Sequence, residues 1–155
     1  MTLDALELDR IQEKLKATLS EKRYIHSLNV AETAVKMAGH YGADEKKTYL
    51  AGLLHDCGKF LKGDMAREYV KSIGYEPDEI EWAQPGLLHA IIGEHLARKE
   101  YGITDPEILG AIRWHNTGKA GMTLVEKIIY IADYIEPGRK FDGVEAMREE
   151  AFRDL

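Results

Sequence analysis

The adjacent pair His55-Asp56, within residues 53–59, places two metal-binding side chains at the end of an apolar run. Neighbouring residues on a helix point about 100° apart and do not face each other. They can still share one ion where a helix ends and the backbone turns away. Imidazole nitrogen together with carboxylate oxygen suits iron, manganese, cobalt, zinc or nickel. The pair therefore predicts a metal site.

Further ligand types occur in apolar helical segments elsewhere in the chain. They are His26, His89, His115 and Asp133. Ligands that are scattered in this way form a site only when their helices pack together, unlike the short local spacing of a zinc finger. The lack of cysteine ligands disfavours a purely structural zinc site. We therefore expect a buried site assembled from several helices.

Asp133 lies inside the apolar stretch 131–135. A buried carboxylate without a partner costs several kcal/mol, so Asp133 should have a cation beside it. Two alternatives remain open, a metal ion or a salt bridge to Arg139 or Lys127. His40 and His95 are interpreted as ordinary helix residues, because a single histidine on a helix is weak evidence for a site.

The bulk composition indicates one ordinary globular domain of 155 residues, spanning 1–155. The net charge of −6 argues against nucleic-acid polymers and anionic membranes as partners, since both need a basic face. Cys57 is the single cysteine, which excludes an internal disulfide and fits a reducing compartment; we expect it to fill core space. No apolar run approaches the ~20 residues of a membrane span, and no signal peptide is evident, so the sequence predicts a cytoplasmic protein.

Apolar residues recur at three- and four-residue spacing throughout, which predicts an all-α bundle. Helix starts are indicated by Asp44, by Asp105-Pro106 and by a capping box at 123–126, and Gly42 and Pro137 mark helix ends. The third helix is predicted to run to Gly58, and the last to begin near Gly143 and to be still helical at Leu155. The predicted helices are approximately 8–19, 23–40, 44–58, 64–73, 77–82, 87–101, 105–115, 123–136 and 143–155.

The ordered residues His26, His55-Asp56 and Asp133, each with its neighbours, resemble the HD superfamily of metal-dependent phosphohydrolases. The stretches 88–93, 111–118 and 133–139 narrow the resemblance to its YqeK-type branch of symmetrical bis(5'-nucleosyl)-tetraphosphatases. The resemblance covers about 23–155 and implies an HD-type helical bundle, with residues 20–137 as its metal-binding core. Members of this branch extend past the point where this chain stops, and that extension helps to close the nucleotide site; a shortened C-terminal helix is thus an expectation.

The resemblance also implies roles for individual residues. The primary metal, expected to be iron, would be bound by His26, His55, Asp56 and Asp133. A second ion or the phosphates would be contacted by His89 and His115, so one or two ions are expected. Asp56 and Lys59 are the expected catalytic residues. The expected substrate contacts are Arg23, His26, Asp56, Lys59, His89, His115, Asn116, Thr117, Asp133 and Arg139.

The implied reaction is hydrolysis of dinucleoside tetraphosphates by metal-activated water, which converts diadenosine tetraphosphate to two ADP. ADP or GDP are the implied products, and the oligomeric state is open, with a homodimer as one option. Alternatives are another nucleotide phosphohydrolase of the HD type, such as a nucleotidase or cyclic-nucleotide phosphodiesterase, a nonenzymatic nucleotide-binding module, or a helical adaptor. No residue clearly recognises the base, and core packing is expected for the aromatic candidates Tyr24, Trp82, Tyr134 and Phe141.

Overall fold

The structure is a computed structural model that describes residues 5–155, and over this range it is helical without any strand. The all-α fold class predicted from the sequence is confirmed. The elements are α1 (Ala5–Thr18), α2 (Glu21–Tyr41), α3 (Glu45–Leu54), α4 (Gly63–Ser72), α5 (Glu79–Ala83), the 3-10 helix η1 (Pro85–Leu88), α6 (His89–Glu100), α7 (Pro106–Trp114), α8 (Leu124–Ile135) and α9 (Val144–Ala151).

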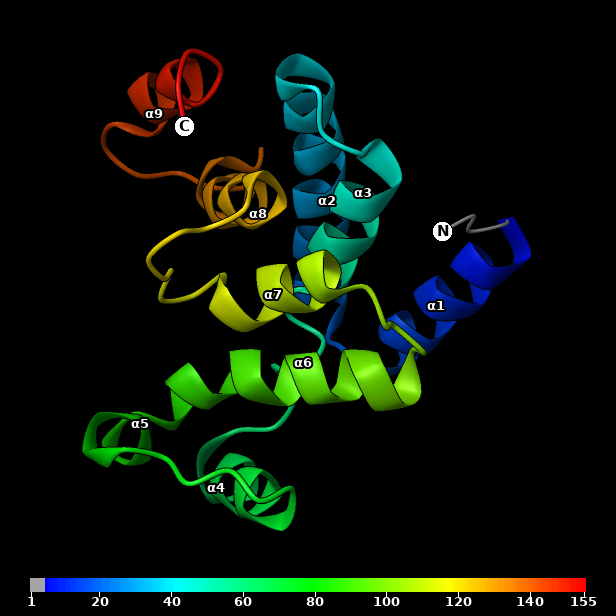
Figure 1. Cartoon of the computed structure of the whole chain (residues 1–155), viewed down its shortest axis with the longest axis vertical. Helices are drawn as coiled ribbons and strands as arrows, with labels where there is room; N and C mark the ends of the chain where they lie inside the picture. The colour runs from blue at the N-terminus through cyan, green and yellow to red at the C-terminus, as the bar shows by residue number, and fades with distance from the viewer. Residues whose placement is uncertain (1–4) are drawn as a thin grey trace.

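The centre of the bundle is formed by α2, α3, α7 and α8, with α6 crossing beneath them in Figure 1. The hairpin of α2 and α3 is the most extensive helix pair. Gly52 permits this close approach, because a Cβ there would lie 2.8 Å from the Cα of Ala31. The leucines of α3 (Leu50, Leu53 and Leu54) are fully buried in the same core. This packing fixes the end of α3 beside α2, where the first candidate ligands lie.

The chain leaves helical geometry at Leu54, so the prediction that the third helix continues to Gly58 is wrong. Residues 55–60 form turns in which the Cys57 N–H donates to the Leu54 carbonyl and the Lys59 N–H to that of Asp56. The turns run tightly against α6, since a Cβ on Gly58 would lie 2.7 Å from the Gly93 nitrogen. This departure from the helix allows two adjacent side chains to face one site.

The predicted helix starts are confirmed by capping bonds. Asp44 and Asp105 accept from backbone N–H groups of the first turns of α3 and α7, and Thr123 forms a capping box with Glu126 at the start of α8. Gly42 ends α2 in the left-handed region, at φ 73°. Such caps are worth about 1 kcal/mol each, which explains why sequence locates these boundaries well.

The prediction that the last segment is still helical at Leu155 is wrong, because α9 ends at Ala151. The Tyr41 hydroxyl donates to the Ala151 carbonyl, and Phe152 contacts the His40 ring. These tertiary contacts compete with the next helical turn and were not visible in the periodicity. None of the helices among residues 5–155 combines the length and the apolar character needed to span a membrane.

Candidate metal and phosphate site

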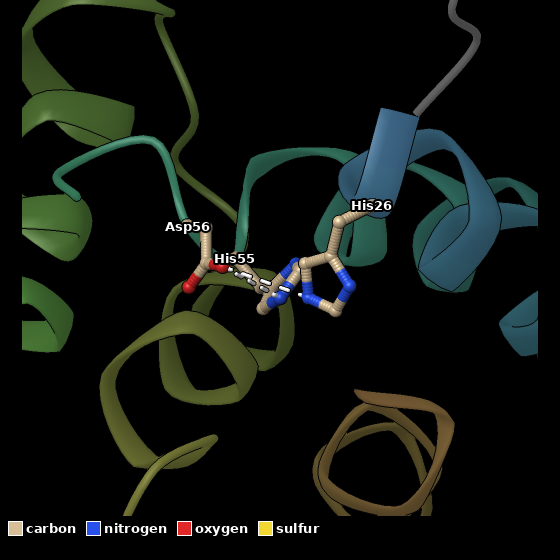
Figure 2. A group of neighbouring side chains, drawn as sticks. All are labelled: His26, His55 and Asp56. Carbon is tan, nitrogen blue, oxygen red and sulfur yellow. Dashed lines mark ion pairs between the residues drawn. The ribbon is translucent and has the colours of Figure 1, made fainter. Parts of the chain in front are cut away.

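The candidate ligands meet where five segments of the chain converge. Figure 2 shows the side chains of His26, from α2, and of His55 and Asp56, from the turn after α3, pointing toward one another. Asp133 reaches the same point from α8. The other two histidines, His89 and His115, come from the start of α6 and the end of α7. The structure thus gathers residues that lie up to 107 positions apart (133 minus 26).

Asp56 divides the site into two clusters, because each carboxylate oxygen faces a different pair of histidines. Its Oδ2 lies 3.6 Å from Nε2 of His26 and 3.4 Å from Nε2 of His55. Its Oδ1 lies 3.4 Å from Nε2 of His89 and 3.3 Å from Nε2 of His115. We call the group of His26, His55, Asp133 and Asp56 Oδ2 the first cluster, and that of His89, His115 and Asp56 Oδ1 the second cluster.

The backbone fixes the tautomer of three of these histidines. Nδ1 of His55 lies 2.6 Å from the Gly52 carbonyl oxygen, and Nδ1 of His115 lies 2.7 Å from that of Ile112. His89 makes the same contact with the carbonyl three residues before it. A carbonyl only accepts, so each Nδ1 must donate, and the neutral ring then directs an Nε2 lone pair into the site.

His26 is oriented by a side chain instead. Its Nδ1 lies 3.3 Å from Oε2 of Glu136, a carboxylate that is only 3% exposed. Gly138 makes room for this carboxylate, since a Cβ there would lie 2.6 Å from Oε1 of Glu136. Glu136 was not among the site residues predicted from the sequence. The available signal was a carboxylate that directly follows the apolar run of α8 and precedes Pro137.

The first cluster contains two histidine nitrogens that lack a hydrogen-bond partner. Oδ1 of Asp133 lies 2.9 Å from Nε2 of His26 and 3.5 Å from Nε2 of His55. Both nitrogens are nevertheless buried without a hydrogen-bond partner. Lone pairs and carboxylate oxygens that converge in this way need a cation between them. The nitrogen and oxygen donor set fits a divalent transition metal.

The electrostatics of the two clusters differ. Burial lowers the pKa of His55, but the neighbouring Asp56 and Asp133 carboxylates outweigh it and raise the pKa to about 9. Burial likewise lowers the pKa of His115, and there it prevails over the attraction of Asp56. Burial favours a raised pKa for Asp56, yet the charge of His55 and the adjacent imidazoles of His115 and His89 hold its pKa well below the usual range. Positive charge is therefore drawn to the first cluster.

A cavity of about 350 Å³ opens onto both clusters. Its walls carry most of the side chains for which phosphate contact is expected, including Lys59 and Asn116. Thr117 does not line it: this residue is exposed, and its hydroxyl donates to the Gly118 carbonyl. The complete lining is Arg23, Asp56, Lys59, His89, His115, Asn116, Asp133, Tyr134, Arg139 and Phe141.

The two arginines of this cavity contact the acidic ligands. Nη1 of Arg23 lies 3.4 Å from Oδ2 of Asp56, and Nη2 of Arg139 lies 3.0 Å from Oδ1 of Asp133. The salt-bridge alternative for Asp133 is thus realised with Arg139, and the metal alternative stays a prediction. Lys59, in contrast, forms no ion pair with any carboxylate of the described residues.

Arg148 of α9 holds the loop that carries Arg139. Its guanidinium donates to the carbonyls of Ile135, Glu136 and Arg139, at 2.9, 3.0 and 3.0 Å. One side chain therefore ties α9 to the end of α8 and to the loop after it. Sequence reasoning missed this contact, since an arginine on the exposed face of a short helix gives no local signal for it.

The aromatic candidates behave differently from one another. Tyr24 packs against the core as expected. Tyr134 and Phe141 are 41% and 44% exposed and line the cavity, and Trp82 is also exposed, so the core-packing prediction is wrong for these three. The predictions for residues outside the site are confirmed for Cys57, which is buried, and for His95, which pairs with the Tyr69 hydroxyl.

The sequence of the chain matches a family model for the HD domain over residues 23–138. The chain belongs to the HD domain family. HD domains bind divalent metals, and in this chain the His/Asp clusters lie within the matched range. The resemblance inferred from His26, His55-Asp56 and Asp133 is confirmed.

Similar HD proteins carry more specific names. The chain is 44% identical to "Bis(5'-nucleosyl)-tetraphosphatase, symmetrical" of Bacillus subtilis (strain 168), over 91% of this chain and 75% of that protein. It is 42% identical to the protein of the same name from Staphylococcus aureus (strain NCTC 8325 / PS 47), over 95% and 75%. The crystal structure of a predicted HD superfamily hydrolase involved in NAD metabolism from Clostridium acetobutylicum superimposes with a TM-score of 0.92, at 48% identity, covering 95% of this chain and 78% of that one.

Proposed function

We propose that this HD protein is a symmetrical bis(5'-nucleosyl)-tetraphosphatase, which hydrolyses diadenosine tetraphosphate to two ADP. The observation that carries this proposal is Asp56, whose two oxygens join two histidine clusters on the floor of a cavity with cationic walls. Such a site suits a polyanionic chain of phosphates. The choice of a dinucleoside tetraphosphate is supported by the names of the relatives, which match the chain over most of its length.

We propose His26, His55, Asp56 and Asp133 as ligands of the primary metal, with iron as its identity among the divalent transition metals that the donor set accepts. His89 and His115 would hold a second ion or contact phosphate. A divalent ion at this position supplies a lowered pKa for water and positive charge beside the phosphate oxygens. Residues 1–155 would then form a single HD domain, with about 20–137 as its metal-binding core.

The protein's own groups would position the reactants. Asp56 stays an anion because of its low pKa, and so can accept a hydrogen bond from the attacking water. Attack on an inner phosphorus breaks its bond to the central bridging oxygen, and that oxygen leaves with the second ADP. Water supplies one oxygen to the first ADP and releases a proton. The leaving ADP carries several negative charges, so cations matter most in the transition state.

The cationic side chains of the cavity would bind that charge. Lys59 is the cation most available to a phosphate, since its ammonium group has no carboxylate partner among the described residues. Arg23 and Arg139 face both the cavity and the acidic ligands, so they can contact phosphates while they also fix the carboxylates. Asn116 offers an amide donor beside His115.

Product analysis in ¹⁸O-labelled water tests this proposal. Metal-loaded protein is incubated with diadenosine tetraphosphate and with a panel of mononucleotides and cyclic nucleotides, and products are separated by ion exchange. We expect two ADP per dinucleotide, with one ¹⁸O atom in one of them. Formation of AMP and ATP would contradict symmetrical cleavage. Free phosphate from mononucleotides, or a linearised cyclic nucleotide, without turnover of the dinucleotide would indicate a different HD phosphohydrolase.

A further inference from the structure

A second cavity opens beside the first, where the turns before α4 meet η1. It has a volume of about 200 Å³. Lys62 and Gly86 line this cavity but do not line the first one. We call it the Lys62 cavity. Lys62 is not one of the residues of the metal and phosphate site, and Gly86 takes part in it through its carbonyl group, which orients His89.

The two cavities adjoin the same two side chains. Lys59 and His89 line both of them. His89 belongs to the second cluster and is almost fully buried, and its orientation is fixed by the Gly86 carbonyl at the floor of the Lys62 cavity. A phosphate chain that lies across Lys59 and His89 therefore borders both cavities.

The first cavity is too small to hold both halves of the substrate. Its volume of about 350 Å³ is near the lower end of ligand pockets, which span roughly 300–1,000 Å³. A dinucleoside tetraphosphate consists of two equal nucleoside diphosphate halves. If the central bridge lies at the clusters, one half fills the first cavity, and the other must continue past Lys59 and His89.

The chemistry of the Lys62 cavity suits that second half. Lys59 and Lys62 both face it, and neither ammonium group has an ion-pair partner among residues 5–155. Leu61 and Pro85 supply apolar wall. Two unpaired cations beside an apolar surface match the phosphates and the nucleoside of one nucleoside diphosphate.

We propose that the Lys62 cavity binds the second nucleoside diphosphate half of the substrate, with the phosphate bridge crossing between the cavities at Lys59 and His89. This inference rests on the proposed function and adds to it a place for each half. In this arrangement Lys62 contacts a phosphate, and the second nucleoside occupies the space beside Gly86.

Charge reversal at Lys62 tests the phosphate contact. We expect Lys62→Glu to raise the KM for diadenosine tetraphosphate by at least about tenfold, the order of magnitude for losing one hydrogen bond to a charged group. Lys46→Glu is the matched control, because Lys46 is an exposed lysine of α3 that lines neither cavity and makes the same change in net charge. Metal content and thermal unfolding of both variants verify that the fold and the ions are retained.

A steric variant tests the nucleoside contact. A Cβ on Gly86 would meet no atom within 4 Å, and the backbone there does not require glycine, so Gly86→Leu should fold and fill part of the cavity. We expect a higher KM for the dinucleotide. The inhibition constant of adenosine 5'-tetraphosphate, which carries only one nucleoside, should stay within about twofold, the scatter allowed for a surface substitution.

The outcomes separate the two proposals. If the unaltered protein forms no ADP from the dinucleotide, the proposed function fails and the half-site assignment fails with it. If it forms two ADP while Lys62→Glu and Gly86→Leu keep the KM of the Lys46→Glu control, only the Lys62 cavity assignment is overturned. Equal weakening of the dinucleotide and of adenosine 5'-tetraphosphate by Gly86→Leu would also overturn the place given to the second nucleoside.

Discussion

The two histidine clusters share Asp56 but differ in how their inward-facing atoms could be satisfied. In the first cluster, two histidine nitrogens and two carboxylate oxygens converge; the oxygens also contact Arg23 and Arg139, whereas the two nitrogens have no hydrogen-bond partner. In the second cluster, Nε2 of His89 and Nε2 of His115 lie 3.0 Å apart. The backbone makes both of these nitrogens acceptors in the neutral rings, so neither can donate to the other. The second cluster therefore offers a cation two imidazole nitrogens and one carboxylate oxygen, whereas the first offers two nitrogens and two carboxylate oxygens.

The charge around the clusters points the same way. Besides Asp56, the first cluster has the Asp133 carboxylate in contact and Glu136 behind His26. Among residues 5–155, the second cluster has no carboxylate oxygen in ion-pair contact other than Oδ1 of Asp56. More anionic ligands bind a divalent cation more tightly, so we expect a tight site at the first cluster and a weaker one at the second. Two clusters with equal numbers of histidines are therefore expected to bind a metal ion with unequal affinity.

The largest effect is expected from the residue that the clusters share. Asp56→Ala removes an oxygen from both, so metal should be lost from both and kcat should fall by at least about 10³-fold, which corresponds to several kcal/mol of charge stabilisation. Metal analysis and kinetics measure this. Asp9→Ala, on the exposed face of α1, is the control for a lost carboxylate. Full activity of Asp56→Ala in a strong chelator would refute the metal site.

Lys59→Ala separates phosphate binding from metal binding, because a protonated ammonium group cannot be a ligand. Metal content should be unchanged. Turnover should fall by a factor on the order of 10²–10³ if Lys59 stabilises transition-state charge, whereas KM alone should rise if it binds the ground state. Lys46→Ala is the control. Unchanged kinetics would make Lys59 a solvated surface charge.

His115→Ala tests the asymmetry of the clusters directly. The tight ion should remain, while the weaker one is lost and kcat/KM falls by about 10²-fold, the loss of one well-placed electrostatic contact. His26→Ala should lose the tight ion instead. His95→Ala, which affects only the contact with Tyr69, is the matched control. Loss of all metal from His115→Ala would show that the clusters bind ions as one unit.

The smallest effect is expected at Glu136, which acts through His26. Glu136→Gln keeps an acceptor for Nδ1 but removes a buried charge, so metal affinity should fall by about 10- to 100-fold, the usual cost of changing a group behind a ligand. Glu126→Gln is a matched control, since Glu126 is a buried carboxylate at the other end of α8 that bonds to the helix cap and not to the clusters. Equal metal affinities for the two variants would show that Glu136 does not support metal binding through His26.

Sequence predicted the helices and the ligand types well for local reasons. Caps such as Asp44 and Thr123 act within one helical turn. The 3.6-residue period of apolar side chains can be read directly from the sequence. The end of α3 was missed because it depends on the close approach of Gly58 to α6. The same limit applies to the site. The ligand residues could be named from their settings, but the roles of Glu136 and Arg148 arise from contacts over 110 and 9 to 13 positions, which no local pattern encodes.

The most direct test of the two unequal clusters is a titration of metal-stripped protein with Mn²⁺, followed by calorimetry and by electron paramagnetic resonance of the free ion. We predict two binding steps with dissociation constants at least about tenfold apart, because the two clusters differ in ligand charge. Asp133→Ala should abolish the tighter step and leave the weaker one. Absence of binding, or an Asp133→Ala protein that retains both steps unchanged, would contradict it.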